Sequence, residues 1–570
     1  MAEEIWMLQT KKADFNRISA EFGIDPVTAR IIRNRGIEGD EAIRRYLDGT
    51  PADFYDPYLL KDMDKAVRIL KKKAADGSRI RIVGDYDIDG VCSTYILYQA
   101  FRRLGAFVDY EIPDRIKDGY GINEAIIEQA HEDGVDTILT CDNGISAFSQ
   151  ISLAKQYGMT VVVTDHHEVP TDGDEEILPP ADAVVNPKQA GCGYPFPEIC
   201  GGAVAFKLAE ALYRDCGIPG EEREALLEFA AIATVGDVMK LQDENRILVK
   251  YGLKRIARTR SVGLRKLVEK NNLYIDRITA YHIGFVIGPC LNAGGRLQTA
   301  KLALSLLLSE DEEEADRLAV ELKELNDTRK DMTEQGTQEA KILVDAFYKG
   351  DSVLVVFLPE CHESLAGIIA GRLREYYQKP SIILTRSEGA VKGSGRSIDG
   401  YHMFRKLSEV KDLLLKFGGH PMAAGLSLKE EDIDEFRRRL NACSGLTEED
   451  FKAKVWIDVP MPMGYVTERL VREFDRLEPF GQGNEKPLFA EKGLRVRNAR
   501  VIGRNRNVVR MTLEEEQGRA VEAIYFGDGD AFEEERAGRR VMDIVYYPDI
   551  NEYNGRKTLQ AVVRRVRFHG

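Results

Sequence analysis

A short stretch of alternating carboxylates constrains this 570-residue chain more than any other feature. The segment Gly84-Asp-Tyr-Asp-Ile-Asp-Gly90 follows the mostly apolar run 80–83, which predicts a short buried strand. In an extended segment, Asp85, Asp87 and Asp89 would lie on one face, where three negative charges repel one another unless a cation lies between them. The sequence therefore predicts a metal site at the end of this strand.

Two other interpretations of this stretch are weaker. An EF-hand calcium loop begins with the same spacing, but the twelfth position counted from Asp85 is Ile96, where that loop requires a bidentate Glu. The preceding segment also has the pattern of a strand instead of a helix. A solvated acidic turn is the second alternative, and the apolar run 91–101 that follows disfavours it.

Three further apolar runs end at acidic or imidazole side chains. The runs and the residues that follow them are 137–141 with Asp142, 160–164 with Asp165, His166 and His167, and 229–235 with Asp237. Helix-like segments separate the first strands, and this alternation predicts an α/β fold with a doubly wound parallel sheet. Because ligands collect at the carboxyl ends of parallel strands, these four distant segments are expected to meet at one edge of the sheet.

The ligand types narrow the choice of metal. Carboxylates with one or two imidazoles and no thiolates favour Mn²⁺, with Mg²⁺ as an alternative, and zinc remains open because His and Asp also bind it. The carboxylates are more numerous than one structural ion needs. We therefore expect two divalent ions about 3.5–4 Å apart, bridged by one carboxylate, as in enzymes that displace phosphoryl groups.

This series of motifs resembles the DHH phosphoesterase superfamily and, within it, the RecJ family of bacterial single-strand-specific exonucleases. The resemblance implies that Asp142 bridges the ions, that Asp85 is a ligand or a close neighbour of one, and that His167 contacts the scissile phosphate. Asp165 would orient a histidine. The implied catalytic set consists of Asp85, His167 and the family's other metal ligands, which are Asp87, Asp89, Asp142, His166 and Asp237.

Segments on both sides of these motifs resemble the family's substrate contacts. Residues 113–121 resemble a loop that lines the nucleic-acid path, with Arg115 as a contact and Tyr120 as a stacking platform for a base. Residues 288–296 resemble the segment that leads into the connecting helices, with Asn292 and Arg296 as backbone or phosphate contacts. An ordinary turn aromatic is the alternative for Tyr120.

A second α/β unit is predicted after residue 351 and resembles the DHHA1 domain of the same superfamily. Glycines in 392–397 and 418–425 would let a polynucleotide backbone approach closely. Lys392, Arg396 and His420 would donate hydrogen bonds to a phosphate there. The alternative, glycines that serve only tight turns, does not account for the cations.

The last 120 residues differ in charge from the rest of the chain. They contain 22 Lys and Arg against 19 Asp and Glu, whereas the whole chain has a formal net charge of −14. Alternating strands predict a small all-β barrel, whose basic side chains suit a groove for single strands, as in OB-folds. A charged face that only keeps the barrel in solution is the alternative. The expected contacts are Arg495, Arg497, Arg500, Arg504 and Arg506.

We expect five regions along the chain. They are a helical N-terminal extension (1–50), a doubly wound parallel-sheet DHH catalytic domain (51–240), a helical connector (241–347), a smaller α/β DHHA1 domain (348–447) and an all-β OB-fold (448–570). The dense charge of 311–339 predicts a long solvated helix that bridges two lobes. Eight scattered cysteines without a CxxC pair, and the lack of an apolar run of membrane length, favour a cytoplasmic protein with no membrane contact.

The resemblance implies a two-metal 5′→3′ exonuclease that degrades single-stranded DNA to 5′-mononucleotides in DNA repair and recombination. Its further partners would be a single-strand-binding protein and a helicase. A short-oligonucleotide (nanoRNA) or cyclic-dinucleotide phosphodiesterase is the main alternative, ahead of a non-catalytic scaffold and a pyrophosphatase-like enzyme. Cys290 stands where many relatives carry an arginine, which implies that one phosphate contact is missing or moved.

Overall fold

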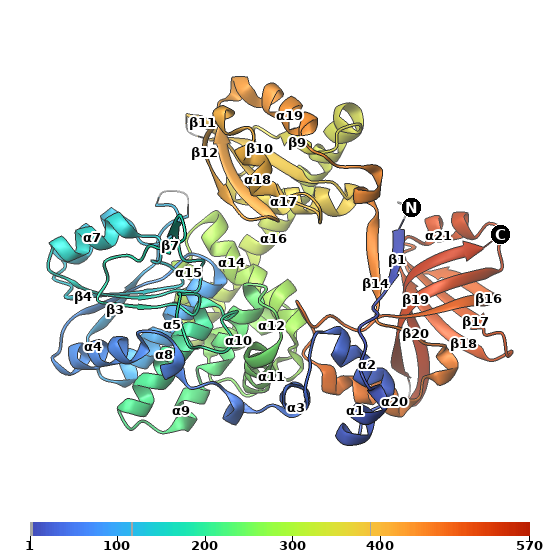
Figure 1. Ribbon diagram of the computed structural model, residues 1–570, viewed down its shortest axis with the longest axis horizontal. Coiled ribbons are helices and arrows are strands. Elements are labelled where there is room, and N and C mark those ends of the chain that lie inside the picture. The colour runs from blue at the N-terminus through green and yellow to red at the C-terminus, as the bar shows by residue number, and fades with distance from the viewer. Residues whose placement is uncertain (1–3, 116–117, 388, 554, 570) are drawn as a thin grey trace.

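The structure is a computed structural model that describes residues 4–115, 118–387, 389–553 and 555–569. It consists of a larger α/β domain with packed helices, a smaller α/β domain and a barrel (Figure 1). The 32-residue helix α16 (Glu312–Leu343) joins the two α/β domains, as the charged pattern of 311–339 predicts. The strand β14 (Ala453–Ile457) lies between the smaller domain and the barrel.

The larger domain contains a five-stranded parallel sheet in the order β3-β2-β4-β5-β8. Helices α5 (Ile88–Arg103) and α8 (Gly201–Asp215) cover one face, and α6 (Glu124–Glu132) and α7 (Phe148–Gln156) cover the other. Strands buried on both faces are mostly apolar, as β4 and β5 are here, so this doubly wound sheet agrees with the predicted one. The strands are β2 (Ile80–Val83), β3 (Val108–Glu111), β4 (Thr137–Cys141), β5 (Thr160–Thr164) and β8 (Ala183–Val185).

One apolar run that was expected to be a strand is a helix. Residues 229–235 belong to α10 (Leu227–Gly236), around which α5, α8 and α11 (Asp243–Ile256) pack. A helix that is buried on all sides has no amphipathic period, so its sequence looks like that of a buried strand. Asp237 therefore lies at the C-cap of a helix and not at the end of a strand.

A group of helices extends the core of the larger domain toward α16. Helices α12 (Val262–Lys270), α14 (Gly288–Leu297) and α15 (Lys301–Leu308) pack against α16 and share one hydrophobic core with α5 and α8. A single turn of π-helix, η4 (Ile283–Ile287), runs directly into α14. These helices place α14 between the sheet edge and the smaller domain.

The smaller domain has a mixed five-stranded sheet in the order β12-β13-β11-β10-β9. Helix α17 (Glu363–Tyr377) packs on one face, and α18 (Met403–Ser408) and α19 (Ile433–Ala442) pack on the other. The expected α/β unit is thus confirmed. Its strands are β9 (Leu354–Phe357), β10 (Ser381–Ser387), β11 (Ala390–Arg396), β12 (Leu414–Gly419) and β13 (Ala423–Leu428).

The C-terminal strands close into a barrel because β16 pairs with both β17 and β19. Strands β18 and β20 pair in parallel, and α21 (Gly529–Arg536) precedes β19, which is the arrangement of an OB-fold. The strands are β16 (Phe489–Ile502), β17 (Val508–Glu514), β18 (Ala520–Phe526), β19 (Val541–Tyr553) and β20 (Arg556–His569).

The N-terminal region completes the barrel core. Its three helices, α1 (Phe15–Phe22), α2 (Pro26–Asn34) and α3 (Asp40–Asp48), share one hydrophobic cluster with the barrel strands. The region also contains a strand that the sequence did not predict, β1 (Glu4–Leu8), which pairs in parallel with β14. Both marked chain ends consequently lie beside the barrel in Figure 1.

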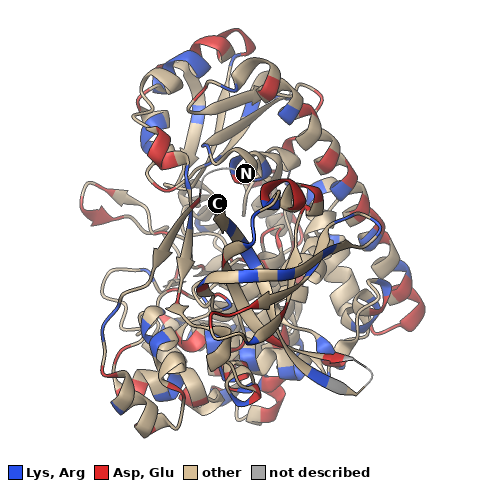
Figure 2. Ribbon diagram, turned by 90° about the vertical axis from the view of Figure 1, so that its right-hand side faces the viewer, with Lys and Arg blue, Asp and Glu red and all other residues tan. Residues whose placement is uncertain are grey.

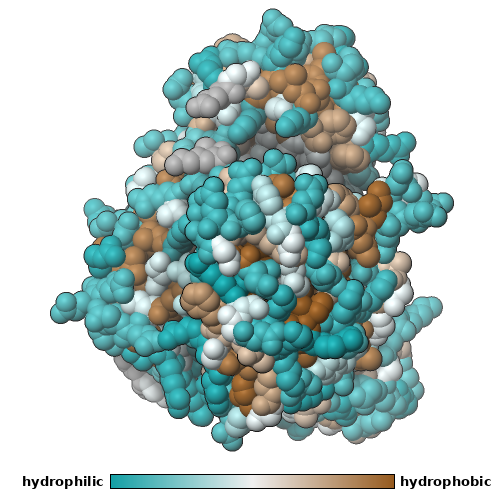
Figure 3. All heavy atoms as spheres, turned by 90° about the vertical axis from the view of Figure 1, so that its left-hand side faces the viewer, coloured by the Kyte–Doolittle hydropathy of each residue, from teal (hydrophilic) through white to brown (hydrophobic). Residues whose placement is uncertain are grey.

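The molecular surface is polar on the faces shown. Lys and Arg alternate with Asp and Glu over all parts of the chain, and the barrel strands nearest the viewer in Figure 2 carry several Lys and Arg. Hydrophilic residues cover most of the face in Figure 3, with small hydrophobic groups between them. Within the described ranges, no helix combines the length and apolar character needed to cross a membrane.

The buried guanidinium of Arg246 in α11 joins three distant parts of the chain. Its Nε donates to the carbonyl of Tyr46 in α3 (2.8 Å), and its Nη1 and Nη2 donate to the carbonyls of Leu477 and Arg476 (2.8 Å each). The guanidinium also lies 4.0 Å from the centre of the Tyr46 ring. Loss of this side chain would remove the Arg246 donor from the carbonyls of Tyr46 and Arg476, whereas the carbonyl of Leu477 keeps the donor Nδ2 of Asn484 (2.8 Å).

Replacement of Arg246 by Met is expected to destabilise the junction between the N-terminal helices and the barrel by about 2–4 kcal/mol, because unsatisfied buried carbonyls are costly. The two tryptophans of the chain, Trp6 and Trp456, lie in the paired strands β1 and β14 and report on this junction. Their fluorescence during urea unfolding measures the effect as a lower midpoint. The control is Arg68→Met on α4 (Met63–Ala75), whose side chain is 73% exposed; equal midpoints for both variants would contradict the prediction.

Candidate metal centre

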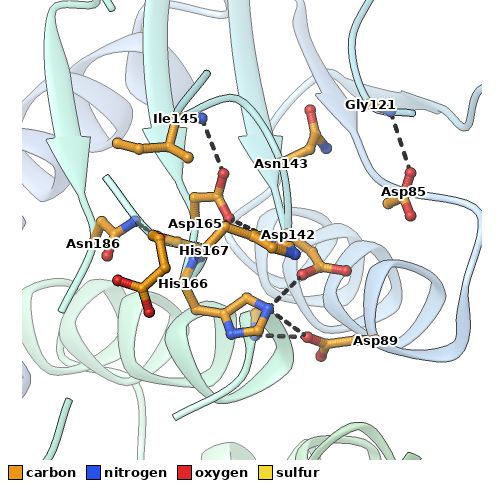
Figure 4. Close-up of polar contacts among 12 residues, drawn as sticks. Asp85, Asp89, Gly121, Asp142, Asn143, Ile145, Asp165, His166, His167 and Asn186 are labelled. Atoms are coloured by element: carbon orange, nitrogen blue, oxygen red, sulfur yellow. Dashed lines mark hydrogen bonds and ion pairs between the residues drawn. The ribbon is translucent and has the colours of Figure 1, made fainter. Parts of the chain in front are cut away.

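The predicted metal-site residues surround the carboxyl edge of the larger parallel sheet (Figure 4). Asp85 follows β2, Asp142 follows β4, and His166 follows β5 by one residue. Asp142 has a left-handed backbone (φ 62°), a conformation that Asp adopts more readily than most residues and that lets the chain turn at the end of the strand. Side chains from separate chain segments thus come together at one edge.

The spacing of Asp87 and Asp89 suggested an extended segment, but both residues lie at the start of a helix. Asp87 is the N-cap of α5, and its Oδ1 accepts hydrogen bonds from the N–H groups of Asp89 (2.9 Å) and Gly90 (3.1 Å). Asp89 accepts hydrogen bonds from the N–H groups of Gly201 and Gly202 (2.7 Å each). Because these glycines begin α8, the positive end of that helix stabilises the Asp89 carboxylate.

Three overlapping groups of side chains could each hold a cation. In every group the potential ligand atoms lie within 4.8 Å of one another. Asp142 and His166 each belong to two groups, so the three form one continuous centre. The groups are Asp85, Asp87 and Asp142; Asp89, His166 and Asp237; and Asp142, His166 and His167.

His166 is at the middle of this centre. Its Nε2 lies 3.0 Å from Oδ1 of Asp142, 3.5 Å from Oδ2 of Asp89 and 3.8 Å from Oδ2 of Asp237 (Figure 4). Burial lowers the pKa of His166, which leaves the imidazole neutral at neutral pH. A neutral imidazole among carboxylates is a good ligand for a transition-metal ion.

Two observations support bound cations at this centre. Within the described part of the chain, the buried Nδ1 of His166 has no hydrogen-bond partner, although such atoms are normally satisfied. A Cβ atom at Gly201 would lie only 2.6 Å from Cβ of Asp142, so glycine is needed to leave space beside this carboxylate. The donor set and the space therefore fit divalent ions.

Burial and mutual repulsion make the carboxylates poor anions without a cation. Burial, followed by the charge of Asp87, raises the pKa of Asp85 to about 8. Burial, followed by the charges of Asp89 and Asp87, raises the pKa of Asp237 to about 8. Burial and the same neighbours also raise the pKa of Asp142. A bound cation would stabilise the ionised forms.

Asp165 orients the second histidine. It accepts hydrogen bonds from the N–H groups of Ile145 (2.9 Å) and His166 (2.7 Å), and its Oδ1 lies 2.8 Å from Nδ1 of His167. Burial alone would lower the pKa of His167, but the hydrogen bond and charge of Asp165 raise this pKa to about 9. His167 is therefore a cation at neutral pH, held at the edge of the centre.

Two asparagines support the centre and were not predicted. Asn143 donates to the carbonyl of Val83 (3.0 Å) and accepts from the N–H of Ile122 (3.2 Å), so it links β2 to the loop before α6. Asn186 donates to the carbonyl of His167 (2.9 Å). Asn143 and Asn186 lie just beyond the ends of β4 and β8, so the strand-end position that singled out Asp142 also identifies them.

Tyr120 lies over the centre. Its hydroxyl donates to the carbonyl of Asp142 (2.8 Å) and lies 3.1 Å from Nδ1 of His167. Its ring is edge-on to that of Tyr86 (6.3 Å between centroids) and is 52% exposed. An exposed aromatic ring fixed beside a metal centre remains suited to stack with a base.

A pocket of about 370 Å³ lies between the two α/β domains, beside the metal-site turn that contains Tyr86. Burial, followed by the charges of Arg115 and Arg329, lowers the pKa of Arg296 to about 10. Among the described residues, none of the three arginines in the pocket forms an ion pair, so the pocket is suited to an anion. Its predicted substrate residues are Arg115, Arg296, Lys392 and Arg396.

The predicted substrate residues other than the three arginines have different surroundings. Lys392 pairs with Glu363 (2.9 Å), and His420 is exposed and does not line the pocket. The Oδ1 of Asn292 accepts a hydrogen bond from the N–H of Ile88 (2.8 Å) and so fixes the start of α5. Cys290 is buried away from this pocket, where its Sγ accepts a hydrogen bond from Asn326 (3.3 Å).

The predicted barrel contacts are exposed on β16 and in the turn that follows it. Arg497 pairs with Glu514 (2.6 Å) and Arg506 with Asp530 (2.6 Å), which reduces their local charge. Arg495, Arg500 and Arg504 form no ion pair with another residue that the structure describes. These three are therefore the more available cations.

Family models match three regions of the chain. Residues 79–234 match the N-terminal domain of the DHH family, residues 350–445 match the DHHA1 domain, and residues 457–565 match the RecJ OB domain. The chain is 39% identical over 564 residues to the single-stranded-DNA-specific exonuclease RecJ of Bacillus subtilis, covering 98% of this chain and 70% of that protein. It is 35% identical to RecJ of Haemophilus influenzae, covering 94% and 95%.

Solved structures lead to the same assignment. RecJ from Thermus thermophilus in complex with Mn²⁺ superposes with a TM-score of 0.83 at 29% identity, covering 99% of this chain and 79% of that chain. The Mg²⁺ complex of that protein gives a TM-score of 0.78 at 28% identity. These comparisons confirm the expected DHH, DHHA1 and OB architecture, and relatives of this fold bind divalent ions. The chain belongs to the RecJ family of DHH phosphoesterases.

Proposed function

We propose that this protein is a metal-dependent exonuclease that hydrolyses single-stranded DNA in the 5′→3′ direction and releases 5′-mononucleotides during DNA repair and recombination. The observation that carries this proposal is the buried carboxylate–histidine centre, whose metal-site turn contributes Tyr86 to an arginine-lined pocket. The relatives named as single-stranded-DNA-specific exonucleases support the substrate. The barrel, for which a phosphodiesterase of very short substrates has little use, also favours a long strand.

The proposed centre holds two divalent ions, with Mn²⁺ preferred and Mg²⁺ as a substitute. Asp142 would be shared between them, because it belongs to one group with Asp85 and Asp87 and to another with His166 and His167. When bound, such ions activate water and stabilise the charge of a phosphoryl group during its displacement. The proposed ligands are Asp85, Asp87 and Asp142 on one side and Asp89, Asp142, His166 and Asp237 on the other.

The side chains of the protein supply binding and orientation. His167, a cation held by Asp165, is proposed to donate a hydrogen bond to a non-bridging oxygen of the scissile phosphate. Arg115, Arg296 and Arg396 hold phosphate groups in the pocket. The ring of Tyr120 stacks with a base.

The remaining parts of the chain guide the strand. Unpaired barrel cations attract phosphates along β16, as in other single-strand-binding grooves. We assign these roles to a DHH catalytic domain (51–240), a helical connector (241–347), a DHHA1 domain (348–447) and an OB domain (448–570) that includes the N-terminal helices in its core. We further propose a cytoplasmic location, since all eight cysteines are free, and cooperation with a helicase and a single-strand-binding protein.

Replacement of Asp142 by Asn is expected to reduce strand hydrolysis by on the order of 10³-fold or more, because the bridging carboxylate is lost. Binding of single-stranded DNA should remain measurable by fluorescence anisotropy. Calorimetric titration with Mn²⁺ should show two ions per chain for the unmodified protein and fewer for the variant.

The matched control for this experiment is Asp174→Asn in the same domain, where the carboxylate is exposed and outside the centre. It should leave both hydrolysis and Mn²⁺ stoichiometry unchanged. Full activity of Asp142→Asn in a metal-defined buffer would rule out the proposed centre.

Binding of Mn²⁺ at pH 7 is expected to release protons. The pKa of Asp85 and of Asp237 is about 8, so both carboxyls are largely protonated at pH 7 without metal, whereas the metal binds their ionised forms. Apparent Mn²⁺ affinity should therefore rise as the pH increases from 7 through about 8. Calorimetry in two buffers of different ionisation enthalpy measures the released protons, and equal binding enthalpies in both would contradict this expectation.

Digestion of end-labelled strands tests direction and substrate. A label at the 5′ end of a long single strand should appear first as a mononucleotide, and a label at the 3′ end should remain in a long product. A fully paired duplex should resist hydrolysis. Early release of the 3′ label, or faster cleavage of dinucleotides than of long strands, would contradict the assignment.

A further inference from the structure

An exposed pair of aromatic rings has no role in the site described above. Tyr281 in α13 (Ala280–His282) is 64% exposed and Phe285 in η4 is 69% exposed. Their rings stack at 4.8 Å between centroids, with 27° between the planes. Ile283 and Ile287 of the same segment are fully buried. The segment is therefore anchored through its isoleucines and presents both rings to solvent.

This segment lies close to the metal centre. A Cβ atom at Gly284 would be 3.7 Å from Cγ1 of Val235, which is two residues before Asp237. Turn η4 continues into α14, whose Asn292 fixes the start of α5 and whose Arg296 lines the interdomain pocket. Eleven residues separate Phe285 from Arg296, about 17 Å along a helix. One helical run thus extends from the rings, past the centre, to the pocket.

The same surface continues toward the barrel. Val238, which follows the metal-site Asp237, is 66% exposed. Three residues later, the N–H of Leu241 donates to the carbonyl of Gln482 (2.7 Å), in the segment that leads to the barrel. Figure 1 also shows α12, the helix before the aromatic segment, on the side of the larger domain that is nearer to the barrel.

The chemistry around the rings suits a nucleic acid better than a protein. The segment that leads to the pair is polar: Asp276, Arg277 and Thr279 are exposed, and the guanidinium of Arg277 lies 5.4 Å from the ring of Tyr274. A stable protein interface needs a larger continuous apolar area than two rings provide. A base needs only one flat ring face, and a nearby guanidinium can contact the strand. Single turns of π-helix are also frequent at functional sites.

We propose that Tyr281 and Phe285 form a base-stacking platform for single-stranded DNA on the barrel side of the metal centre. This inference rests on the proposed function and deepens it. With the 5′ end in the arginine pocket, the strand crosses the centre and its following bases stack on these rings before it reaches the barrel. Stacking accepts every base, so the platform holds the strand without selecting its sequence.

The test uses Phe285→Ala and the double variant Tyr281→Ala/Phe285→Ala in the full chain. With divalent ions withheld, the dissociation constant of each variant for a long fluorescent single strand should be higher than that of the unmodified protein. The expected increase is between about 5-fold and about 150-fold, the range for one lost stacking contact. Because the rings carry no charge, the dependence of binding on salt concentration should keep its slope. Tyr281→Phe keeps the ring and should bind as the unmodified protein does.

The chain offers a matched control. Phe347 is 70% exposed and also lies in a turn of π-helix, η5 (Val344–Tyr348), next to the smaller domain. Phe347→Ala should bind strands like the unmodified protein. A series of strands, each with 2-aminopurine at one position, locates the stacked base. At one position the fluorescence should be quenched when the strand binds the unmodified protein or Phe347→Ala, but not when it binds the double variant.

A substrate too short to reach the platform separates the possible failures. Phe285→Ala should cleave a trinucleotide at the unmodified rate and a long strand with a higher KM. If the unmodified protein cleaves no single strand, the proposed function fails. If it does, but Phe285→Ala binds long strands normally or loses activity equally on both substrates, only the platform is overturned. Normal DNA binding with altered sedimentation would assign the rings to a protein contact and would also overturn it.

Discussion

Repulsion among buried carboxylates is the constraint on which the rest of this structure depends. Several aspartates share one small volume at the edge of a parallel sheet, and each is held by its surroundings. Asp87 caps its own helix, Asp89 accepts from the start of α8, and Asp142 lies on a left-handed turn against Gly201. Burial and the neighbouring negative charges raise the pKa of Asp85 and of Asp237, and a bound cation would offset both effects.

The position of the nucleic-acid path follows from helices that touch both the centre and the smaller domain. Asn292 near the middle of α14 fixes the start of α5, and Arg296 near its end donates to the carbonyl of Ser364 in the smaller domain (2.9 Å). The pocket and the metal ligands are therefore coupled through one rigid element. A shift of the smaller domain relative to α14 would therefore change the distance between the pocket and the centre.

The sequence predicted most of this architecture for a physical reason. Strands buried on both faces, such as β4 and β5, are mostly apolar and end abruptly at polar ligands, so both the fold and the candidate ligands were visible. The predictions were wrong where burial removes periodicity: α10 looked like a strand because no side of it is polar. Supporting contacts between distant segments, such as those of Arg246 with the carbonyls of Tyr46 and Leu477, leave no local pattern. The pairing of β1 with β14 is also invisible for this reason.

The shared core of the N-terminal helices and the barrel has a consequence for biosynthesis. Residues such as Ile31 and Leu47 emerge from the ribosome first, yet the strands that cover them come last. Closing so long a loop is slow and costs chain entropy. The α/β domains between them can fold in the meantime, whereas the first helices must wait with apolar surface uncovered. This segment would consequently be a candidate for binding by a chaperone until the barrel strands are made.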